Sequence, residues 1–493
     1  RILAMGITLA FTGLTATAQG TPDQDARYTA ALADIRAEIK LTDAAATMRT
    51  LCSEQYGPAC YTLGSAYESL TTPDYPSAYT FYDRACQFGD ADGCVDQGFL
   101  DYSGAAGTVD MAAAVARFRQ GCEADNGVGC RNLAYMQKSG TGVPAVDQVA
   151  ARASYVKGCQ LEDAEACFFE GLFARNGTGG PVDDVQAFAA YTKSCASNYA
   201  DGCNNLGVMY ANGAATVQDY TEARRLFEIA CAGGDRYGCD NAGDFMREGK
   251  GGPLDLATAY ARFTTACEAD LGEACFQAAY ALENGQGVPA DAIAARATYE
   301  TACEIYAYAC NNLGVMYRNG RGGPMDEAGA RLLYVKACDE GGTMLACDNY
   351  ADLLQTGDGG PEDPILARTY YEKACEGDNA DACNQLGFMT AEGQGGPPDQ
   401  AQGLTYYARG CELKNGSACS NAAKGYYNGA GVAKDDTMAR SLFQTGCDLG
   451  DSDACHNLNI AFARGIGGIV DPTAATTAKA RACELGREAS CGA

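Results

Sequence analysis

The sequence predicts an all-α protein, and more narrowly an α/α solenoid of about twelve disulfide-bridged two-helix repeats. Three observations support this fold class. A unit of about 36 residues recurs from Cys52 to Cys491, as is typical of solenoids. The 26 cysteines fall into 13 pairs, and eleven of these pairs enclose seven residues. Apolar residues at helical spacing follow each pair.

Residues 1–18 are expected to be a signal peptide whose charged n-region is truncated. Residues 2–14 are apolar and uncharged, and residues 16–18 are the small residues that signal peptidase prefers. The mature chain would begin near Gln19. The alternative is that residues 1–18 remain as an uncleaved anchor. No later apolar run approaches the ~20 residues of a membrane span.

Residues 19–52 are expected to form an N-terminal helical half-unit, and residues 52–491 the solenoid with atypical terminal units. In the last unit Lys479 replaces an aromatic residue, as a polar terminal cap would require. The half-unit has an apolar stripe at helical spacing, made of Ala31, Leu32, Ile35 and Ile39.

Each repeat opens with a helix at the second cysteine of a pair. Four residues later stands Gly or Ala in eleven of twelve units, including Gly207 and Gly314. Gly inside a helix costs up to about 1 kcal/mol, so we expect another backbone to approach closely there. A Gly-rich turn such as residues 319–326 ends the helix, and its Asp326 is the expected N-cap of the next one.

The second helix of each repeat carries the strongest periodic signal. Eight residues before its closing cysteine stands Ala in eleven units and Gly403 in the other. A small residue one turn from an aromatic predicts close packing, so we assign the aromatic stripe to the core. It consists of Tyr82, Phe118, Tyr155, Tyr191, Phe227, Phe263, Tyr299, Tyr334, Tyr371, Tyr407 and Phe443.

Two pairing schemes are open for the cysteines. Each closely spaced pair closes on itself, or the opening and closing cysteines of one repeat join, as Cys60 with Cys86 would. The second scheme isolates Cys52 and Cys491 at opposite ends, whereas the first uses all 26. A helix end, a short turn and a helix start also bring Cα atoms within the ~4.4–6.8 Å that a disulfide needs. We therefore predict bridges between Cys52 and Cys60, Cys86 and Cys94, Cys122 and Cys130, Cys159 and Cys167, Cys195 and Cys203, Cys231 and Cys239, Cys267 and Cys275, Cys303 and Cys310, Cys338 and Cys347, Cys375 and Cys383, Cys411 and Cys419, Cys447 and Cys455, and Cys483 and Cys491.

Composition argues against several classes of function. The net charge of −27 disfavours nucleic acid, which needs clustered Lys and Arg. We expect no cofactor and no metal, because the chain has one histidine, His456, and its cysteines come as isolated twos. Evenly paired cysteines predict an oxidising compartment.

A family resemblance rests on the repeat from Leu313 to Cys338. It contains Leu-Gly-Val-Met-Tyr, then Asn-Gly-Arg-Gly-Gly-Pro-Met-Asp, an Ala, and Tyr-Val-Lys-Ala-Cys. This frame resembles the Sel-one-like repeat (SLR), a relative of the tetratricopeptide repeat, and the cysteine pairs resemble its secreted, Hcp-like bacterial branch. The resemblance implies a right-handed superhelix. Members of that branch are often named β-lactamases or called penicillin-binding, whereas others in the wider family are adaptors.

The β-lactamase alternative needs Ser-x-x-Lys, Ser-x-Asn and Lys-[Ser/Thr]-Gly. Ser154 and Lys157 match the first motif and residues 138–140 the last, but the order is reversed and no Ser-x-Asn occurs. Both matches fall on repeat positions, since Lys157 aligns with Lys336 and Lys373. We therefore assign no catalytic residue, and a single histidine excludes a metallo-β-lactamase.

A polar series on the first helices is the candidate peptide-binding surface. The resemblance implies that first helices line a concave groove in which Asn holds the backbone of an extended peptide. The alternative is that each Asn bonds the backbone of a neighbouring repeat, since a buried amide needs partners. The Asn stands two residues after the opening cysteine in seven of twelve units, as Asn132, Asn205, Asn241, Asn312, Asn349, Asn421 and Asn457.

These observations predict a periplasmic or secreted scaffold that binds peptides or partner proteins in its concave groove. We expect a monomer that binds no nucleic acid and has no membrane span after signal cleavage. The alternative function, implied by family names, is β-lactam binding or weak β-lactam hydrolysis.

Overall fold

The computed structural model of the chain describes residues 20–491, so the expected signal peptide at 1–18 lies outside the described residues. Within the described part, the secondary structure is entirely helical, with 26 α-helices and a final 3-10 turn. The predicted all-α solenoid is therefore confirmed. We call the odd-numbered helices from α3 onward the first helices, and the even-numbered helices from α4 onward the second helices.

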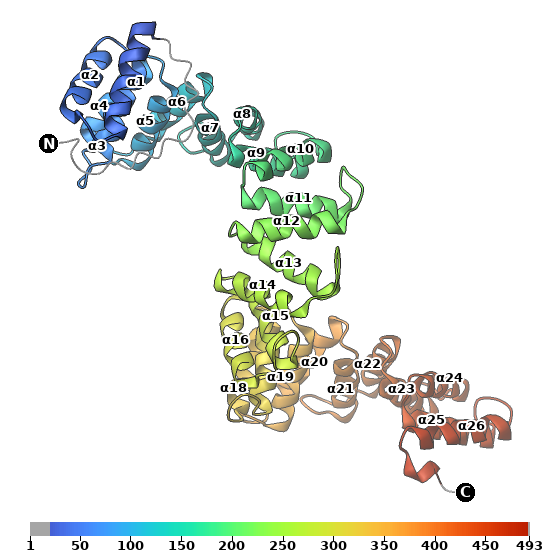
Figure 1. Ribbon diagram of the computed structural model, residues 1–493. Coiled ribbons are helices and arrows are strands. Elements are labelled where there is room, and N and C mark those ends of the chain that lie inside the picture. Colours follow the sequence, from blue (N-terminus) through green and yellow to red (C-terminus); the bar gives the residue numbers. More distant parts are fainter. Residues whose placement is uncertain (1–19, 492–493) are drawn as a thin grey trace. The chain divides into compact units, whose positions relative to one another are not determined.

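The chain divides into two compact units, residues 1–255 and 256–493. In each unit, successive helices pair and the pairs stack on one another (Figure 1). The helices of the first unit are α1 (Pro22–Arg36), α2 (Leu41–Ser53), α3 (Gly57–Glu68), α4 (Tyr75–Gln87), α5 (Ala91–Ser103), α6 (Met111–Glu123), α7 (Gly127–Ser139), α8 (Gln148–Gln160), α9 (Ala164–Asn176), α10 (Asp184–Ala196), α11 (Ala200–Asn212), α12 (Tyr220–Ala232) and α13 (Arg236–Glu248). Those of the second unit are α14 (Leu256–Glu268), α15 (Gly272–Asn284), α16 (Ala292–Ile305), α17 (Ala309–Arg318), α18 (Glu327–Asp339), α19 (Met344–Thr356), α20 (Pro364–Glu376), α21 (Ala380–Glu392), α22 (Gln400–Glu412), α23 (Gly416–Asn428), α24 (Asp436–Asp448), α25 (Ser452–Arg464), α26 (Pro472–Glu484) and the 3-10 turn η1 (Glu488–Ser490).

Residues 19–52, expected to hold half a unit, contain a helix pair instead. Glu38 and Lys40 have positive φ angles of 54° and 46°, which separate α1 from α2. Ile39 lies between them and is 51% exposed, so its expected place in the apolar stripe is wrong. The other three stripe residues are buried, namely Ala31, Leu32 and Ile35.

The turns follow the chemistry of their residues. Asp326 precedes α18 and its carboxylate accepts the Gly329 amide at 2.8 Å, as predicted for an N-cap. Gly213 ends α11 with a φ of 67°, a left-handed conformation that costs a residue without Cβ little. Pro364 occupies the first turn of α20, where its missing N–H costs nothing.

The aromatic stripe forms the core, as predicted. Ten of its eleven residues are buried, and Tyr407 is partly exposed. The nearest neighbour of the first-helix Gly is an aromatic ring of the second helix, and backbone approaches as well, since a Cβ at Gly387 would lie 3.0 Å from the Gly403 carbonyl oxygen. A Cβ at Gly314 would lie 2.6 Å from the ring of Tyr334, and a Cβ at Gly207 would lie 2.8 Å from the ring of Phe227.

Thirteen disulfides join the described cysteines, in the first of the two pairing schemes. The first twelve link the last turn of one helix pair to the first helix of the next, and the thirteenth links α26 to Cys491 after η1. The Cα atoms lie between 4.3 and 5.0 Å apart. So many structural disulfides indicate an oxidising compartment outside the cytoplasm.

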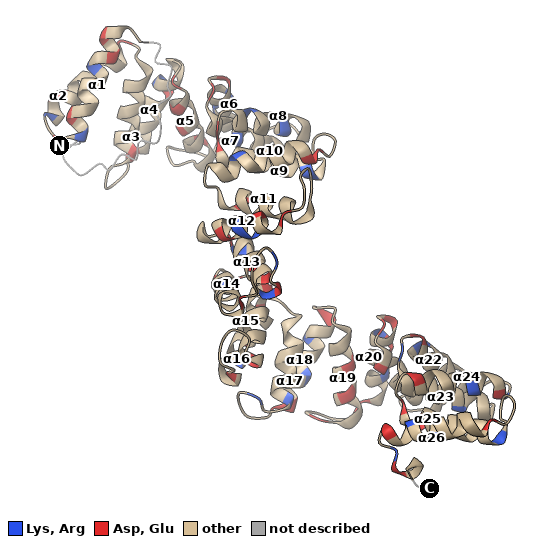
Figure 2. Cartoon of the chain, turned by 45° about the vertical axis from the view of Figure 1, so that its right-hand side comes forward, with Lys and Arg blue, Asp and Glu red and all other residues tan. Residues whose placement is uncertain are grey.

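Acidic residues occur on helices and turns throughout both units (Figure 2). This distribution agrees with the net charge of −27. Among the described helices, none combines the length and the apolar character needed to cross a membrane.

Candidate functional site

The first helices expose one side to solvent, which we call the first-helix face. From α3 to α13, successive first helices lie close to one another, whereas most successive second helices in this range lie farther apart. The first helices are therefore on the inner side of the local curvature of unit 1. Exposed aromatic residues occur on this face five residues after the opening cysteine, as is typical of interaction surfaces. They are Phe99, Tyr135, Tyr280 and Phe388, which are 38–47% exposed.

Three members of the asparagine series bond the neighbouring repeat. In each case Nδ2 donates to the Oδ1 of an Asn that stands one residue after the opening cysteine of the preceding repeat. The pairs are Asn241 with Asn204 at 2.8 Å, Asn349 with Asn311 at 3.0 Å and Asn421 with Asn384 at 2.9 Å. The acceptor is a side chain, and not the backbone that the alternative assumed. An amide has two donor hydrogens and two acceptor lone pairs, so one bond leaves capacity for a ligand.

The remaining asparagines have different surroundings. Asn132 donates to the Val128 carbonyl of its own helix at 2.8 Å. Asn312 donates to the Tyr299 hydroxyl at 3.2 Å, and this hydroxyl donates to Glu283 at 2.9 Å. No side-chain hydrogen bond within the described residues is formed by the last two members of the series, which are Asn205 and Asn457. The seven residues therefore share a position but not a bonding pattern.

An arginine on the second helix bonds the turn of the following repeat, a contact that sequence reasoning missed. Its guanidinium Nη donates to a carbonyl in the Gly-rich turn. The contacts are Arg152 with Pro181 at 2.9 Å, Arg224 with Pro253 at 2.9 Å, Arg296 with Pro324 at 3.1 Å, Arg331 with Pro361 at 3.0 Å and Arg440 with Ile469 at 3.2 Å. The sequence feature that marks this contact is an Arg directly after the periodic Ala of the second helix. We call this the arginine–turn contact.

The arginine–turn contact requires Gly in the turn. A Cβ at Gly323 would lie 2.4 Å from Nη1 of Arg296, so no larger residue fits beside the guanidinium. Five repeats have an apolar or aromatic residue in place of the Arg, and in three of them Val also replaces the Gly. These pairs are Val115 with Val143, Tyr260 with Val288, and Leu404 with Val432. In these three repeats an apolar pair takes the place of the arginine–turn contact.

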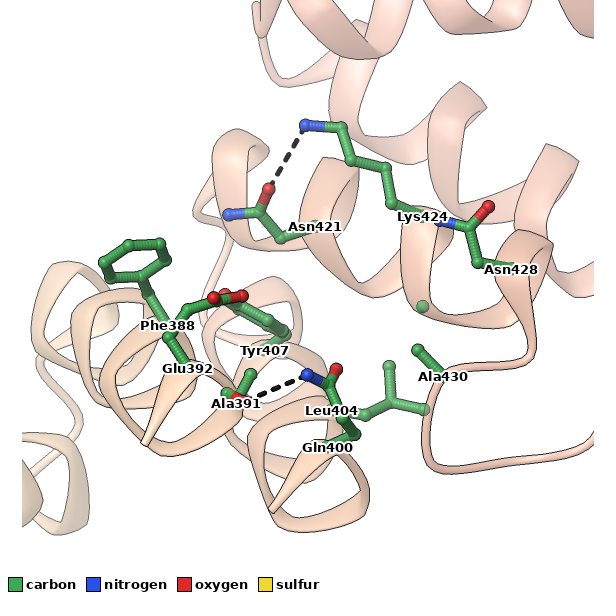
Figure 3. Close-up of a pocket in the computed structure, with 11 residues that line it drawn as sticks. Phe388, Ala391, Glu392, Gln400, Leu404, Tyr407, Asn421, Lys424, Asn428 and Ala430 are labelled. Atoms are coloured by element: carbon green, nitrogen blue, oxygen red, sulfur yellow. Dashed lines mark hydrogen bonds between the residues drawn. The ribbon is translucent and has the colours of Figure 1, made fainter. Parts of the chain in front are cut away.

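A pocket of about 250 Å³ opens between α21, α22 and α23 (Figure 3). Gly425 of α23 lines it, at a position where four other repeats hold a buried methionine. A Cβ at Gly425 would lie 2.8 Å from Cδ1 of Leu404, so this leucine takes up part of the space that the missing side chain leaves. Tyr407 is the one residue of the aromatic stripe that is partly exposed. The four methionines are Met136, Met209, Met316 and Met389.

The pocket has an apolar floor and a polar rim. Leu404 and Tyr407 belong to the apolar part, with Phe388 beside them. On the rim, Lys424 Nζ donates to Asn421 Oδ1 at 3.3 Å, so one member of the asparagine series borders the pocket (Figure 3). A cavity of about 150 Å³ can hold benzene, so this pocket has room for one apolar or aromatic side chain.

Half-buried carboxylates also lie on the first helices. Burial raises the pKa of Asp96 to about 7, and the Glu68 carboxylate contributes to the increase. Burial likewise raises the pKa of Asp348 to about 7, with a contribution from Asp352. A cationic group nearby would favour the ionised form of these residues.

The residues of the β-lactamase alternative have structural contacts. Ser154 Oγ donates to Gln137 Oε1 at 2.8 Å. Lys157 Nζ donates to the Cys122 carbonyl at 2.6 Å, and Lys336 makes the equivalent bond in its own repeat. Lys157 thus satisfies a helix C-terminus as a repeat residue does. Within the described part of the chain, no three His, Cys, Asp or Glu residues are grouped to hold a metal ion.

The fold and the surface define a disulfide-bridged α-solenoid of the kind used for protein interaction. Nine segments of the chain match the model of the Sel1 repeat, and together they cover more than half of its length. The chain therefore belongs to the Sel1 repeat family, and its bridges fit the cysteine-rich, Hcp-like branch. The matched segments are residues 57–90, 127–161, 164–199, 200–235, 272–304, 307–342, 345–379, 380–415 and 416–451.

Solved structures with similar folds include c5321, a protective antigen of uropathogenic Escherichia coli strains that displays an SLR fold. It is 21% identical over 84% of this chain and 88% of its own, with a TM-score of 0.72. A Sel1 repeat protein from Oxalobacter formigenes is 24% identical over 50% of this chain and 96% of its own, with a TM-score of 0.44. Cysteine rich protein B of Helicobacter pylori is 30% identical over 27% of this chain and 94% of its own, with a TM-score of 0.23. No curated protein matches the sequence.

Proposed function

We propose that this protein is a periplasmic or secreted scaffold that binds an extended segment of a partner protein along its first-helix face. One apolar or aromatic side chain of the segment enters the pocket between α21, α22 and α23. The observation that carries the proposal is this pocket, because it opens on a face that also presents Asn421 and exposed aromatic rings.

Two further observations support an extended, basic or neutral ligand. First helices in adjacent repeats pack about 8–10 Å apart, and an extended peptide rises ~3.3 Å per residue, so about every third peptide residue meets a new repeat. Asn amides at that interval offer donors and acceptors to peptide groups. The net charge of −27 disfavours an acidic segment and speeds association with a basic one.

Filling the pocket tests the proposal. Peptides selected from a random dodecapeptide library on the full, oxidised chain are compared on wild type and Gly425→Met. The methionine is the side chain that four other repeats bury here, so it should fill the pocket and weaken binding at least tenfold. Its Cβ would lie 2.8 Å from Cδ1 of Leu404, so the melting temperature of Gly425→Met is measured alongside, and only weaker binding by a folded variant supports the proposal. Ala463→Met places the same side chain on an exposed position of α25 and is the matched control.

The position of the bound peptide gives the second measurement. A benzophenone in the selected peptide should crosslink to α21 and α23. Crosslinks confined to α22 and α24, together with full binding by Gly425→Met, would show that the first-helix face is not the site.

The asparagine series separates binding from stability. Asn205 makes no internal side-chain bond among the described residues, so Asn205→Ala should weaken peptides that span α11 by ~1–2 kcal/mol and leave the melting temperature unchanged. Asn349 bonds Asn311 at 3.0 Å, so Asn349→Ala should lower the melting temperature as well. If Asn205→Ala lowers stability and spares binding, the series is structural.

The compartment is tested separately. The chain expressed with a complete charged leader should be recovered by osmotic shock or from the medium, with its N-terminus near Gln19 and no free thiols. Retention in the cytoplasm with reduced cysteines would contradict this part of the proposal.

A further inference from the structure

The repeat that contains α17 departs from its neighbours in the turn before the helix. Cys303 and Cys310 are separated by one residue fewer than most pairs, and Tyr306 caps α16 in an extended conformation, with φ −140° and ψ 90°. Most other turns of this kind contain a residue with positive φ, such as Asn198 or Asp378. The shorter turn instead presents two tyrosines, Tyr306 and Tyr308.

These tyrosines join two aromatic residues of α15 in a cluster that we call the aromatic patch, made of Phe276, Tyr280, Tyr306 and Tyr308. Phe276 is its centre, with ring centroids 5.7 Å from Tyr308, 6.4 Å from Tyr306 and 6.5 Å from Tyr280. Tyr306 and Tyr308 lie 5.7 Å apart. Tyr280 is 38% exposed and Tyr308 is 44% exposed, so ring surface faces solvent.

The patch also lies next to negative charge. Glu273, on the same helix as Phe276, is exposed, and its carboxylate adds to the effect of burial in raising the pKa of the Tyr306 hydroxyl. The ring faces and the Glu273 carboxylate both attract a cation. A purely hydrophobic partner would leave the Glu273 carboxylate without a favourable electrostatic contact.

We infer that the aromatic patch receives an arginine side chain of the extended segment bound along the first-helix face. A guanidinium is planar and weakly hydrated, so it stacks on rings better than a lysine ammonium does. The chain makes such contacts internally, with the Arg296 guanidinium 3.7 Å from the centre of the Tyr317 ring and Arg440 4.0 Å from that of Phe462. This inference rests on the proposed function and specifies the chemistry of one ligand residue.

The test uses two fluorescein-labelled peptides, Thr-Arg-Thr-Arg-Thr-Arg and the same peptide with citrulline, a neutral isostere, in place of arginine. Fluorescence anisotropy with the full oxidised chain should show that the arginine peptide binds more tightly. The double variant Tyr280→Ala/Tyr308→Ala should weaken the arginine peptide by about tenfold and leave the citrulline peptide unchanged. Tyr280→Phe/Tyr308→Phe keeps the rings and should keep the affinity.

Tyr237→Ala is the matched control, because Tyr237 has the same position relative to its cysteine as Tyr308 and is 50% exposed. Equal binding by the Ala double variant would overturn the inference and leave only general attraction to an acidic protein. If library peptides bind the first-helix face without any preference for arginine, the patch assignment fails while the proposed function stands. If they bind elsewhere and the arginine peptide still depends on the rings, the proposed function fails and the patch assignment stands.

Discussion

The arginine–turn contact predicts a strong coupling between two residues that are far apart in sequence. Arg296 Nη1 donates to the Pro324 carbonyl at 3.1 Å, its guanidinium stacks on Tyr317, and its side chain is 12% exposed. A hydrogen bond from a charged donor contributes about 1.5–3 kcal/mol and a cation–π contact about 1 kcal/mol. Allowing for partial exposure, we expect Arg296→Val to lower the free energy of unfolding by about 2–3 kcal/mol.

Gly323→Val should cost a similar amount by a different route. Its Cβ would lie 2.4 Å from Nη1 of Arg296, so the end of this side chain has to shift and its hydrogen bond to the turn is lost. In the double variant the arginine is already replaced, so the substitution of Gly323 removes no further contact. The two valines also recreate the apolar contact of Val115 with Val143. We therefore expect the double variant to cost about 2 kcal/mol, with a coupling energy of about 2–4 kcal/mol in the cycle.

Guanidinium unfolding followed by far-UV circular dichroism, with the disulfides intact, measures these free energies. Gly107→Val is the matched control. Gly107 has the equivalent turn position in a repeat that has Tyr79 in place of the Arg, and a Cβ there would meet nothing within 4 Å. If the effects of Arg296→Val and Gly323→Val add to within about 0.5 kcal/mol, the two residues do not act as one contact.

Three other outcomes are expected. Replacing Cys195 and Cys203 with Ala should lower the free energy of unfolding by ~2.5 kcal/mol, the loop-entropy value for so short a ring, whereas a peptide map linking Cys203 to Cys231 would refute the pairing. Burial raises the pKa of Asp96 from 3.8 to about 7, so its favourable contribution below about pH 4 is lost as the pH rises through 7. In urea titrations Asp96→Asn should therefore match wild type near pH 4 and be more stable near pH 8, by on the order of 2 kcal/mol, and an equal difference at both values would contradict the assignment. Ser154→Ala should not change any turnover of a chromogenic β-lactam, because Ser154 Oγ is bonded to Gln137, and loss of turnover in this variant would revive the enzyme alternative.

The repeat and its bridges could be predicted because each depends on local chemistry that recurs. The cysteine spacing, the Asp N-caps and the aromatic stripe are visible within about 36 residues of chain. The helix break at Ile39 could not be predicted in the same way. No Gly or Pro marks it, and it depends on positive φ angles at Glu38 and Lys40, which are unusual for such residues.

The candidate site was harder to predict, because it depends on contacts between repeats. Asn241 and Asn312 have the same position in their repeats, but their partners are an Asn of the preceding repeat and Tyr299 of the preceding second helix. The spacing of Asn alone does not distinguish these cases. The first-helix Gly is a similar case. A small residue in a helix predicts a close neighbour, but it does not predict that this neighbour is an aromatic ring.

A residue type that most repeats share at one position is explained by the stability of the fold. Positions that depart from the repeat are therefore better guides to function. Gly425 stands where other units bury methionine, and a pocket results. One residue is missing between Cys303 and Cys310, and the shorter turn brings Tyr308 to the surface with Tyr306 half-buried beside it. Each departure replaces the usual packing or turn, and the replacements also pack internally, with Leu404 close to Gly425 and Tyr306 against the core. The proposal that both departures serve ligand contacts is tested independently at the two positions by the pocket-filling and ring-removal variants.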